Sequence, residues 1–187
     1  MIDQGQLGTI INVNLNFSHS GVFNIPKDNW RLSSKLHSEG PLTTLGSHYI
    51  DLLHYWLGPI EFVGGILSNY SGISKNVYDA NLIFGKMRHL SSPPFVLQSN
   101  YCQPQDKVLF ISGTKSNFEL RNESLMESDL FIKQFTEMYY AIRFSRKFET
   151  DFSAASNVVM VLDAILKSNI EKRMIPLSEY SQYFRDN

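Results

Sequence analysis

The chain has 187 residues, a formal net charge of −1 and an isoelectric point near 6.5. This length fits one domain with a substantial core, and the balanced charge argues against nucleic acids and anionic membranes as partners, since both need clustered Lys and Arg. A single cysteine, Cys102, excludes an internal disulfide and a thiolate zinc site. No apolar run approaches the ~20 residues that span a bilayer, and no export signal opens the chain, so we expect a cytoplasmic protein.

The first predicted element is a strand. Apolar and polar residues alternate after Gly8, with Ile11, Val13, Leu15 and Phe17 in the apolar positions, and this period of two is typical of a half-buried strand. A chain that enters a strand so early looks like the back part of something longer. Residues 20–41 are polar and irregular, which predicts a long loop, and such loops are more often functional than idle.

A helix is predicted over residues 42–57, because it can start after Pro41 and because Gly58 and Pro59 end it. One side of this helix is apolar, with Leu42, Leu45, Tyr49, Leu52, Leu53 and Trp56. The other side, the polar face, carries Thr44, Ser47, His48, Asp51 and Tyr55. A solvated helix face normally carries long charged side chains. These residues are instead short or aromatic and can hydrogen-bond or titrate, so we expect the polar face to look into a site.

The rest of the chain predicts a sheet followed by two helices. Runs with strand character and short, hairpin-like links indicate an antiparallel meander over residues 60–72, 77–86, 94–102, 107–113 and 117–122. Two helices follow, over 129–145 with apolar residues at helical spacing, and over 151–169 with Val158, Val161, Leu162 and Ile165 facing inward. The expected fold class is α+β, with an open, mainly antiparallel sheet and helices on one face. We expect one domain over residues 1–187.

The order of five pieces resembles the C-terminal domain of the GFO/IDH/MocA oxidoreductases, named for glucose-fructose oxidoreductase, inositol dehydrogenase and MocA. The pieces are Gly-x-Leu-Gly-x-Ile entering the first strand, Asn-Trp-Arg in the loop, the Leu-Gly-Ser-His-x-Ile-Asp-Leu helix that closes with Gly, the segment Ile111–Leu120, and the two final helices. The resemblance runs from Gly5 to about Leu177. It implies a C-terminal domain like that of dihydrodipicolinate reductase or glyceraldehyde-3-phosphate dehydrogenase.

The resemblance also implies a two-domain enzyme that uses NAD or NADP. In that family an N-terminal Rossmann domain binds the dinucleotide, a Glu-Lys-Pro lysine assists proton transfer, and the C-terminal domain shapes the substrate pocket. This sequence contains neither G-x-G-x-x-G nor Glu-Lys-Pro, so we name no cofactor-binding residues. We expect the chain alone to be inactive, and either a shortened gene or a cut at the domain boundary accounts for the missing half. The implied reaction is oxidation of a hydroxyl of a sugar, polyol or nucleotide sugar.

The resemblance implies that His48 is the catalytic residue, because it matches the histidine that binds or deprotonates the reacting hydroxyl. An imidazole suits that task, since it accepts a proton near neutral pH. Thr44 stands where many members of the family carry an aspartate that would orient the imidazole. The substrate-binding candidates are Trp30, Arg31, Thr44 and Asp51. Arginine suits a carboxylate or phosphate, although packing of Trp30 and Arg31 and a structural role of Asp51 stay equally open.

Two further expectations concern partners. His37, His48, His54 and His89 do not have the spacing of a metal motif, so we predict no metal. Only 19% of the residues are charged and 13% are aromatic, which predicts a contact with another protein surface. The resemblance implies a homo-dimer or tetramer formed through the sheet and a small-molecule substrate, and the aromatic loops near the site make a carbohydrate the default. The alternative function is a non-enzymatic dimerising or ligand-binding module that kept the fold. Thr44 and the missing Rossmann half favour that alternative.

Overall fold

Seven strands form a single mixed sheet. The computed structural model describes residues 2, 4–88, 91–122, 130–148 and 151–180. The strands are β1 (Ile10–Ser18), β2 (Ile60–Ser68), β3 (Ala80–Met87), β4 (Pro94–Asn100), β5 (Asp106–Gly113), β6 (Asn117–Arg121) and β7 (Ile175–Pro176), and their spatial order is β6-β5-β1-β4-β3-β2-β7. The predicted α+β class and open sheet are confirmed.

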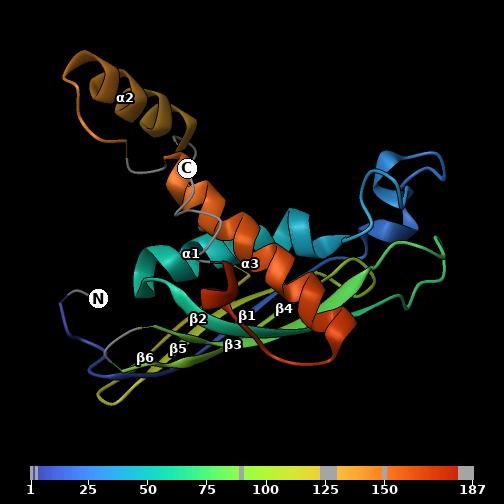
Figure 1. Cartoon of the computed structure of the whole chain (residues 1–187), viewed down its shortest axis with the longest axis horizontal. Helices are drawn as coiled ribbons and strands as arrows, with labels where there is room; N and C mark the ends of the chain where they lie inside the picture. Colours follow the sequence, from blue (N-terminus) through green and yellow to red (C-terminus); the bar gives the residue numbers. More distant parts are fainter. Residues whose placement is uncertain (1, 3, 89–90, 123–129, 149–150, 181–187) are drawn as a thin grey trace.

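Three helices accompany the sheet: α1 (Ser47–Leu57), α2 (Leu130–Arg143) and α3 (Phe152–Glu171). Figure 1 shows α1 and α3 lying over one face of the sheet. Asp151 caps the start of α3, because its carboxylate accepts a hydrogen bond of 3.0 Å from the backbone N–H of Ala154. In the described residues, no helix is both long enough and apolar enough to cross a membrane.

The predicted meander is right for β2-β3-β4 and for β5-β6, which pair antiparallel in chain order, and wrong at the step from β4 to β5. β1 lies between β4 and β5, parallel to the first and antiparallel to the second. Short links predict pairing only between strands that follow one another in the chain. They give no information on the position of β1, which is distant in sequence from both of its partners. As a result, β1 and β4 end side by side, with Ser18 in register with Asn100.

A bulge corrects the predicted alternation within β1. The register shifts between Ile10 and Asn12, so Ile10 is buried and Ile11 is 50% exposed. For Val13 and Leu15 the prediction is right, because both are buried, whereas Phe17 is half-buried and Ser18, in a polar position, is fully buried. The extra residue therefore places Ile10 in the core and Ile11 in solvent, the opposite of the prediction.

The core fills the space between the sheet and the helices α1 and α3. Helix α3 contributes Val158, Val161 and Ile165, which are buried as predicted, while Leu162 is only partly buried. The sheet and α1 contribute the other large buried side chains, among them Val13, Ile50, Leu53, Leu57, Val63, Ile83, Phe95, Leu97 and Leu109. This packing holds α1 against the sheet through its apolar side and leaves its other side free.

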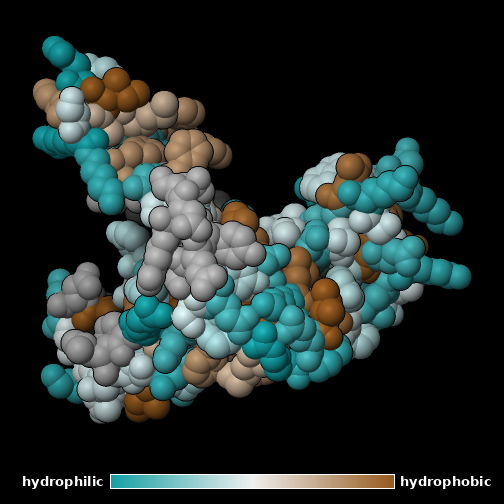
Figure 2. Space-filling model, viewed as in Figure 1, coloured by the Kyte–Doolittle hydropathy of each residue, from teal (hydrophilic) through white to brown (hydrophobic). Residues whose placement is uncertain are grey.

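Helix α2 forms where the sequence predicts it, but its apolar side chains do not join the core. Phe131, Phe135, Tyr139 and Ile142 are 60–73% exposed. Figure 1 shows α2 projecting away from the sheet beyond the start of α3, and Figure 2 shows brown and tan atoms over this projection. Helical periodicity therefore identified the helix and its apolar side, but not what that side contacts.

The second face of the sheet, here called the open face, carries no helix among the described residues (Figure 1). Strand register places Ile66, Leu82, Phe84 and Val96 together on this face. Ile66 is 54% exposed, and Leu82 and Phe84 are 38% and 37% exposed. Three adjacent strands thus present an apolar patch to solvent.

Candidate functional site

The predicted helix over 42–57 is confirmed, and its first turn is a π-helix. This turn spans Leu42–Gly46 and runs directly into α1. π-helical turns are rare and occur frequently at functional sites. The turn is anchored at its start, where Ser99 Oγ on β4 lies 3.2 Å from the carbonyl oxygen of Pro41. At the far end, Gly58 ends the helix with a φ of +79°.

Gly40 shapes the backbone immediately before this turn. Its φ is +55°, and a Cβ at this position would overlap the backbone carbonyl of Tyr78. The carbonyl oxygen of Gly40 accepts hydrogen bonds from the hydroxyls of Thr43 and Thr44, at 3.2 and 3.4 Å. A left-handed φ and the close approach of two chain segments both require glycine here.

The polar face of α1 points outward. His48 and Asp51 are exposed, and Tyr55 is 75% exposed. Their spacing of three and four residues places them on one side of the helix, opposite the buried Tyr49 and Leu53. The imidazole of His48 forms no hydrogen bond or ion pair with the described part of the chain. His48 is therefore free to bind a group outside this chain.

Thr44 lies one turn before His48 but faces a pocket. Its hydroxyl forms a hydrogen bond with the hydroxyl of Tyr101. The pocket has a volume of about 350 Å³ and is lined by His19, Gly21, Val22, Ile25, Arg31, Thr44, Leu45 and Tyr101. This volume lies in the range typical of small-molecule sites. Loop 20–41 and the first turn of the helix supply all of these lining residues except His19 and Tyr101.

His19 and Tyr101 are site residues that the sequence did not reveal. Each follows directly after a strand, His19 after β1 and Tyr101 after β4. Because these strands run in parallel, their ends bring the two rings together in a stack with centroids 4.9 Å apart. The backbone N–H of His19 also donates to the carbonyl of Asn100, at 3.1 Å. Only a prediction that β1 pairs in parallel with β4 could have identified these two residues. The sequence instead predicted a meander, in which the two strands are not paired.

The polar groups of the pocket are hydrogen-bond donors. Nδ1 of His19 accepts the backbone N–H of Gly21 at 2.9 Å, so the neutral ring carries its proton on Nε2. Burial lowers the pKa of His19, and the nearby Arg31 and Lys107 lower it further, which favours this neutral form. Burial raises the pKa of Tyr101 to about 12, so its hydroxyl remains protonated.

The predicted site residues fall into two groups. Arg31 and Thr44 line the pocket. Trp30 does not line it, since its ring packs edge-on against His37 at 5.2 Å and carries the Arg31 guanidinium on its face at 4.5 Å. His48 and Asp51 lie outside the lining, on the exposed side of α1.

The charge of Asp51 affects His54, which lies three residues further along α1. Burial lowers the pKa of His54, and the Asp51 carboxylate opposes this shift. The Asp51 side chain is exposed, so it can also contact a molecule outside this chain.

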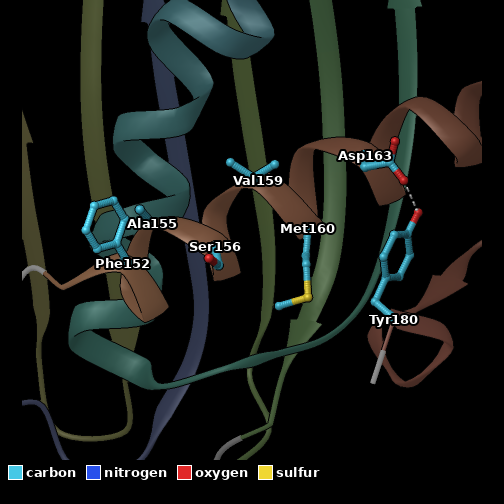
Figure 3. Close-up of a pocket in the computed structure, with 7 residues that line it drawn as sticks. All are labelled: Phe152, Ala155, Ser156, Val159, Met160, Asp163 and Tyr180. Atoms are coloured by element: carbon cyan, nitrogen blue, oxygen red, sulfur yellow. Dashed lines mark hydrogen bonds between the residues drawn. The ribbon is translucent and has the colours of Figure 1, made fainter. Parts of the chain in front are cut away.

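A second cavity, of about 520 Å³, lies along α3 and is shown in Figure 3. Its lining is mainly apolar and comprises Phe152, Ala155, Ser156, Val159, Met160, Asp163 and Tyr180. The Tyr180 hydroxyl donates to the Asp163 carboxylate at 2.6 Å, which the close-up marks with a dashed line. This cavity contains neither an imidazole nor a cation, so it lacks the chemistry of the pocket beside Thr44.

The described residues do not build a site for a metal ion or for the phosphates of a dinucleotide. No group of three or more His, Cys, Asp or Glu side chains in the described ranges could hold a metal. The parallel strand β1 leads into a three-residue 3₁₀ turn, Gly21–Phe23, and not into the glycine-rich turn and helix that cradle a pyrophosphate.

Comparison with known proteins identifies the family. The family model described as the GFO/IDH/MocA C-terminal domain matches residues 1–119 of this chain. The chain belongs to this family. The resemblance inferred from the order of five sequence pieces is thereby confirmed. No curated protein sequence matches the chain.

Solved structures share the GFO/IDH/MocA fold of this chain at low sequence identity. A protein assigned as an NADPH-dependent oxidoreductase from Desulfitobacterium hafniense has a TM-score of 0.83 and 22% identity, over 96% of this chain and 60% of its own. Levoglucosan dehydrogenase in complex with NADH and levoglucosan has a TM-score of 0.77 and 14% identity, over 94% and 60%. A protein assigned as a myo-inositol dehydrogenase from Sinorhizobium meliloti has a TM-score of 0.74 and 14% identity, over 94% and 59%. The chain thus spans about 60% of the length of these structures.

Proposed function

We propose that this chain is the substrate-binding domain of an NAD(P)-dependent oxidoreductase that acts on a hydroxyl of a sugar, polyol or nucleotide sugar. The observation that carries the proposal is the exposed His48 on α1, one turn from a pocket that Thr44 lines, in a chain of an oxidoreductase family. The carbohydrate class is supported by two structural neighbours, which are named as dehydrogenases of levoglucosan and myo-inositol.

In the proposed reaction His48 takes the proton of the reacting hydroxyl. Oxidation of an alcohol removes a proton from oxygen and a hydride from carbon, and a bound nicotinamide is the group that accepts the hydride. The exposed His48 imidazole can hydrogen-bond the hydroxyl and accept its proton. Thr44 and Tyr101 can orient neighbouring hydroxyls from the pocket, where their own hydroxyls already meet. Because Thr44 carries no charge, it orients substrate but cannot make His48 more basic.

The alternative function is a non-enzymatic module that dimerises or binds a small ligand. Thr44 favours it, because the family commonly has a carboxylate at this position. The two functions differ in whether the chain operates together with a Rossmann domain. An in-frame upstream sequence that encodes G-x-G-x-x-G and Glu-Lys-Pro would favour the enzyme.

Binding and reduction of the dinucleotide test the proposal. By calorimetry, we expect this chain alone to bind neither NAD nor NADP, because its sequence lacks G-x-G-x-x-G and its described residues form no phosphate-cradling turn. Joined to a Rossmann domain, in what we call the two-domain enzyme, it should reduce NAD or NADP with a sugar or polyol. Micromolar binding to the chain alone, or a two-domain enzyme inactive on a broad panel of sugars and polyols, would contradict the proposal.

We also propose that the open face forms a homo-oligomer interface. The patch of Ile66, Leu82, Phe84 and Val96 is apolar and partly exposed, and obligate interfaces typically bury ~2,000 Å² or more. Light scattering at micromolar concentration should show a dimer or larger species, and Leu82→Lys should weaken association at least about tenfold. Ile170→Lys, on an exposed residue of α3, is the matched control. A monomeric wild-type chain would refute this interface.

A further inference from the structure

We propose that the pocket beside Thr44 recognises an anionic group, so that the substrate is a sugar bearing a carboxylate or a phosphate. This inference rests on the proposed function and narrows its substrate class. It is carried by the chemistry of the pocket lining, in which the cation of Arg31 and the imidazole N–H of His19 face a cavity that no described acidic residue lines.

The cation is Arg31, and its charge is not neutralised. Its guanidinium lies over the Trp30 ring at 4.5 Å, and it forms no ion pair with a carboxylate of the described residues. Stacking on an aromatic face fixes the plane of the guanidinium and leaves its N–H edge for a ligand. An arginine edge held in this way matches the two oxygens of a carboxylate or phosphate.

A neutral donor, His19, also lines the pocket. Because His19 Nδ1 already accepts the N–H of Gly21, the other nitrogen, Nε2, is a donor. The Tyr101 ring stacks beside it, and the Tyr101 hydroxyl is occupied in its hydrogen bond with Thr44, whose own proton goes to the Gly40 carbonyl. Lys107, which lies over the Phe17 ring at 4.8 Å, adds positive potential at His19. Arg31 and Lys107 thus place positive charge at and near the pocket.

The Asp79 carboxylate, which lies in an adjoining cavity, already accepts hydrogen bonds from the backbone. Asp79 lines a small adjoining cavity that also includes Arg31 and Tyr101. Its two carboxylate oxygens accept the backbone N–H groups of Tyr70 and Ser71, both at 2.8 Å. Val22, Ile25 and Leu45 complete the pocket with apolar surface, and charge interactions are stronger next to apolar walls than in open water.

Binding of sugars to the 187-residue chain tests this inference without requiring turnover. The probes are D-glucuronate, D-glucose 6-phosphate and neutral D-glucose, titrated while the NMR signals of the pocket residues are followed. At least one anionic probe should bind about tenfold or more tightly than glucose, and Arg31→Gln should remove this preference. Arg31→Lys, which keeps the charge, should restore part of it. Lys35→Gln, an exposed change in the same loop outside the pocket, should have no effect.

The titration of His19 provides a second measurement. A bound anion stabilises the imidazolium, so saturation with the preferred probe should raise the pKa of His19 from its lowered value. The relative affinities of glucuronate and glucose 6-phosphate distinguish a carboxylate from a phosphate. If all three sugars bind equally and Arg31→Gln changes nothing, the anion inference is wrong while the proposed function stands. If no sugar shifts the pocket signals, both the inference and the role of this pocket in the proposed function are wrong.

Discussion

His48→Ala in the two-domain enzyme should lower turnover by about 10²–10⁴-fold, the usual contribution of a general acid-base group. The fold should remain intact, because the His48 side chain is exposed and makes no hydrogen bond within the described part of the chain. Removal of such a side chain typically costs ~1 kcal/mol or less in the free energy of unfolding. The variant thus separates a chemical role from a structural one.

Steady-state kinetics and thermal melts should be measured side by side for this variant. His54→Ala is the control, because it removes a second, partly buried imidazole from the same helix, about 120° around the helix axis from His48. That control should lose stability while its turnover stays close to that of the wild type. Near-normal turnover of His48→Ala would mean that the polar face of α1 is structural, and the non-enzymatic alternative would then gain support.

Gly40→Ala should produce the largest loss of stability among single methyl additions near the site. The residue has a φ of +55°, and its new Cβ would meet the backbone carbonyl of Tyr78, which cannot rotate away as a side chain would. The segments that contain Gly40 and Tyr78 would have to move apart where loop 20–41 enters the π-helical turn. We expect a cost of ~3 kcal/mol or more in the free energy of unfolding, measured by chemical denaturation.

Gly72→Ala provides the control for backbone strain alone. Gly72 has a φ of +66°, but no atom lies within 4 Å of a Cβ built there. Its substitution should therefore cost only ~1 kcal/mol, the penalty of a left-handed backbone for a residue with a side chain. The account of Gly40 fails if both substitutions cost the same.

The sequence predicts the parts of this fold that depend on local patterns. Helix 42–57 follows from its apolar periodicity and from the Gly58 stop, and both hold in the structure. The inward positions of α3 also follow from periodicity, because its apolar residues lie on one side of the helix and that side packs against the core. Arg31 and Thr44 were candidates from the loop and the helix, and both line the pocket.

What the sequence misses depends on contacts between distant segments. His19 and Tyr101 are 82 positions apart in the chain and meet only because β1 inserts beside β4 in parallel. Nothing in the alternation of β1 indicates its partner strand, since a half-buried strand has the same pattern in either orientation. The bulge at Ile11 escaped prediction for a similar reason, because one extra residue leaves no compositional signal.

The central claim is that the polar face of α1 forms the substrate side of an oxidoreductase site. A crystal structure of the two-domain enzyme with its dinucleotide and a substrate sugar tests this claim most directly. The account predicts that the His48 imidazole lies within hydrogen-bond distance, about 2.6–3.2 Å, of the hydroxyl that is oxidised, with Thr44 contacting the same sugar. A structure in which the sugar binds elsewhere and His48 still points into solvent would contradict it.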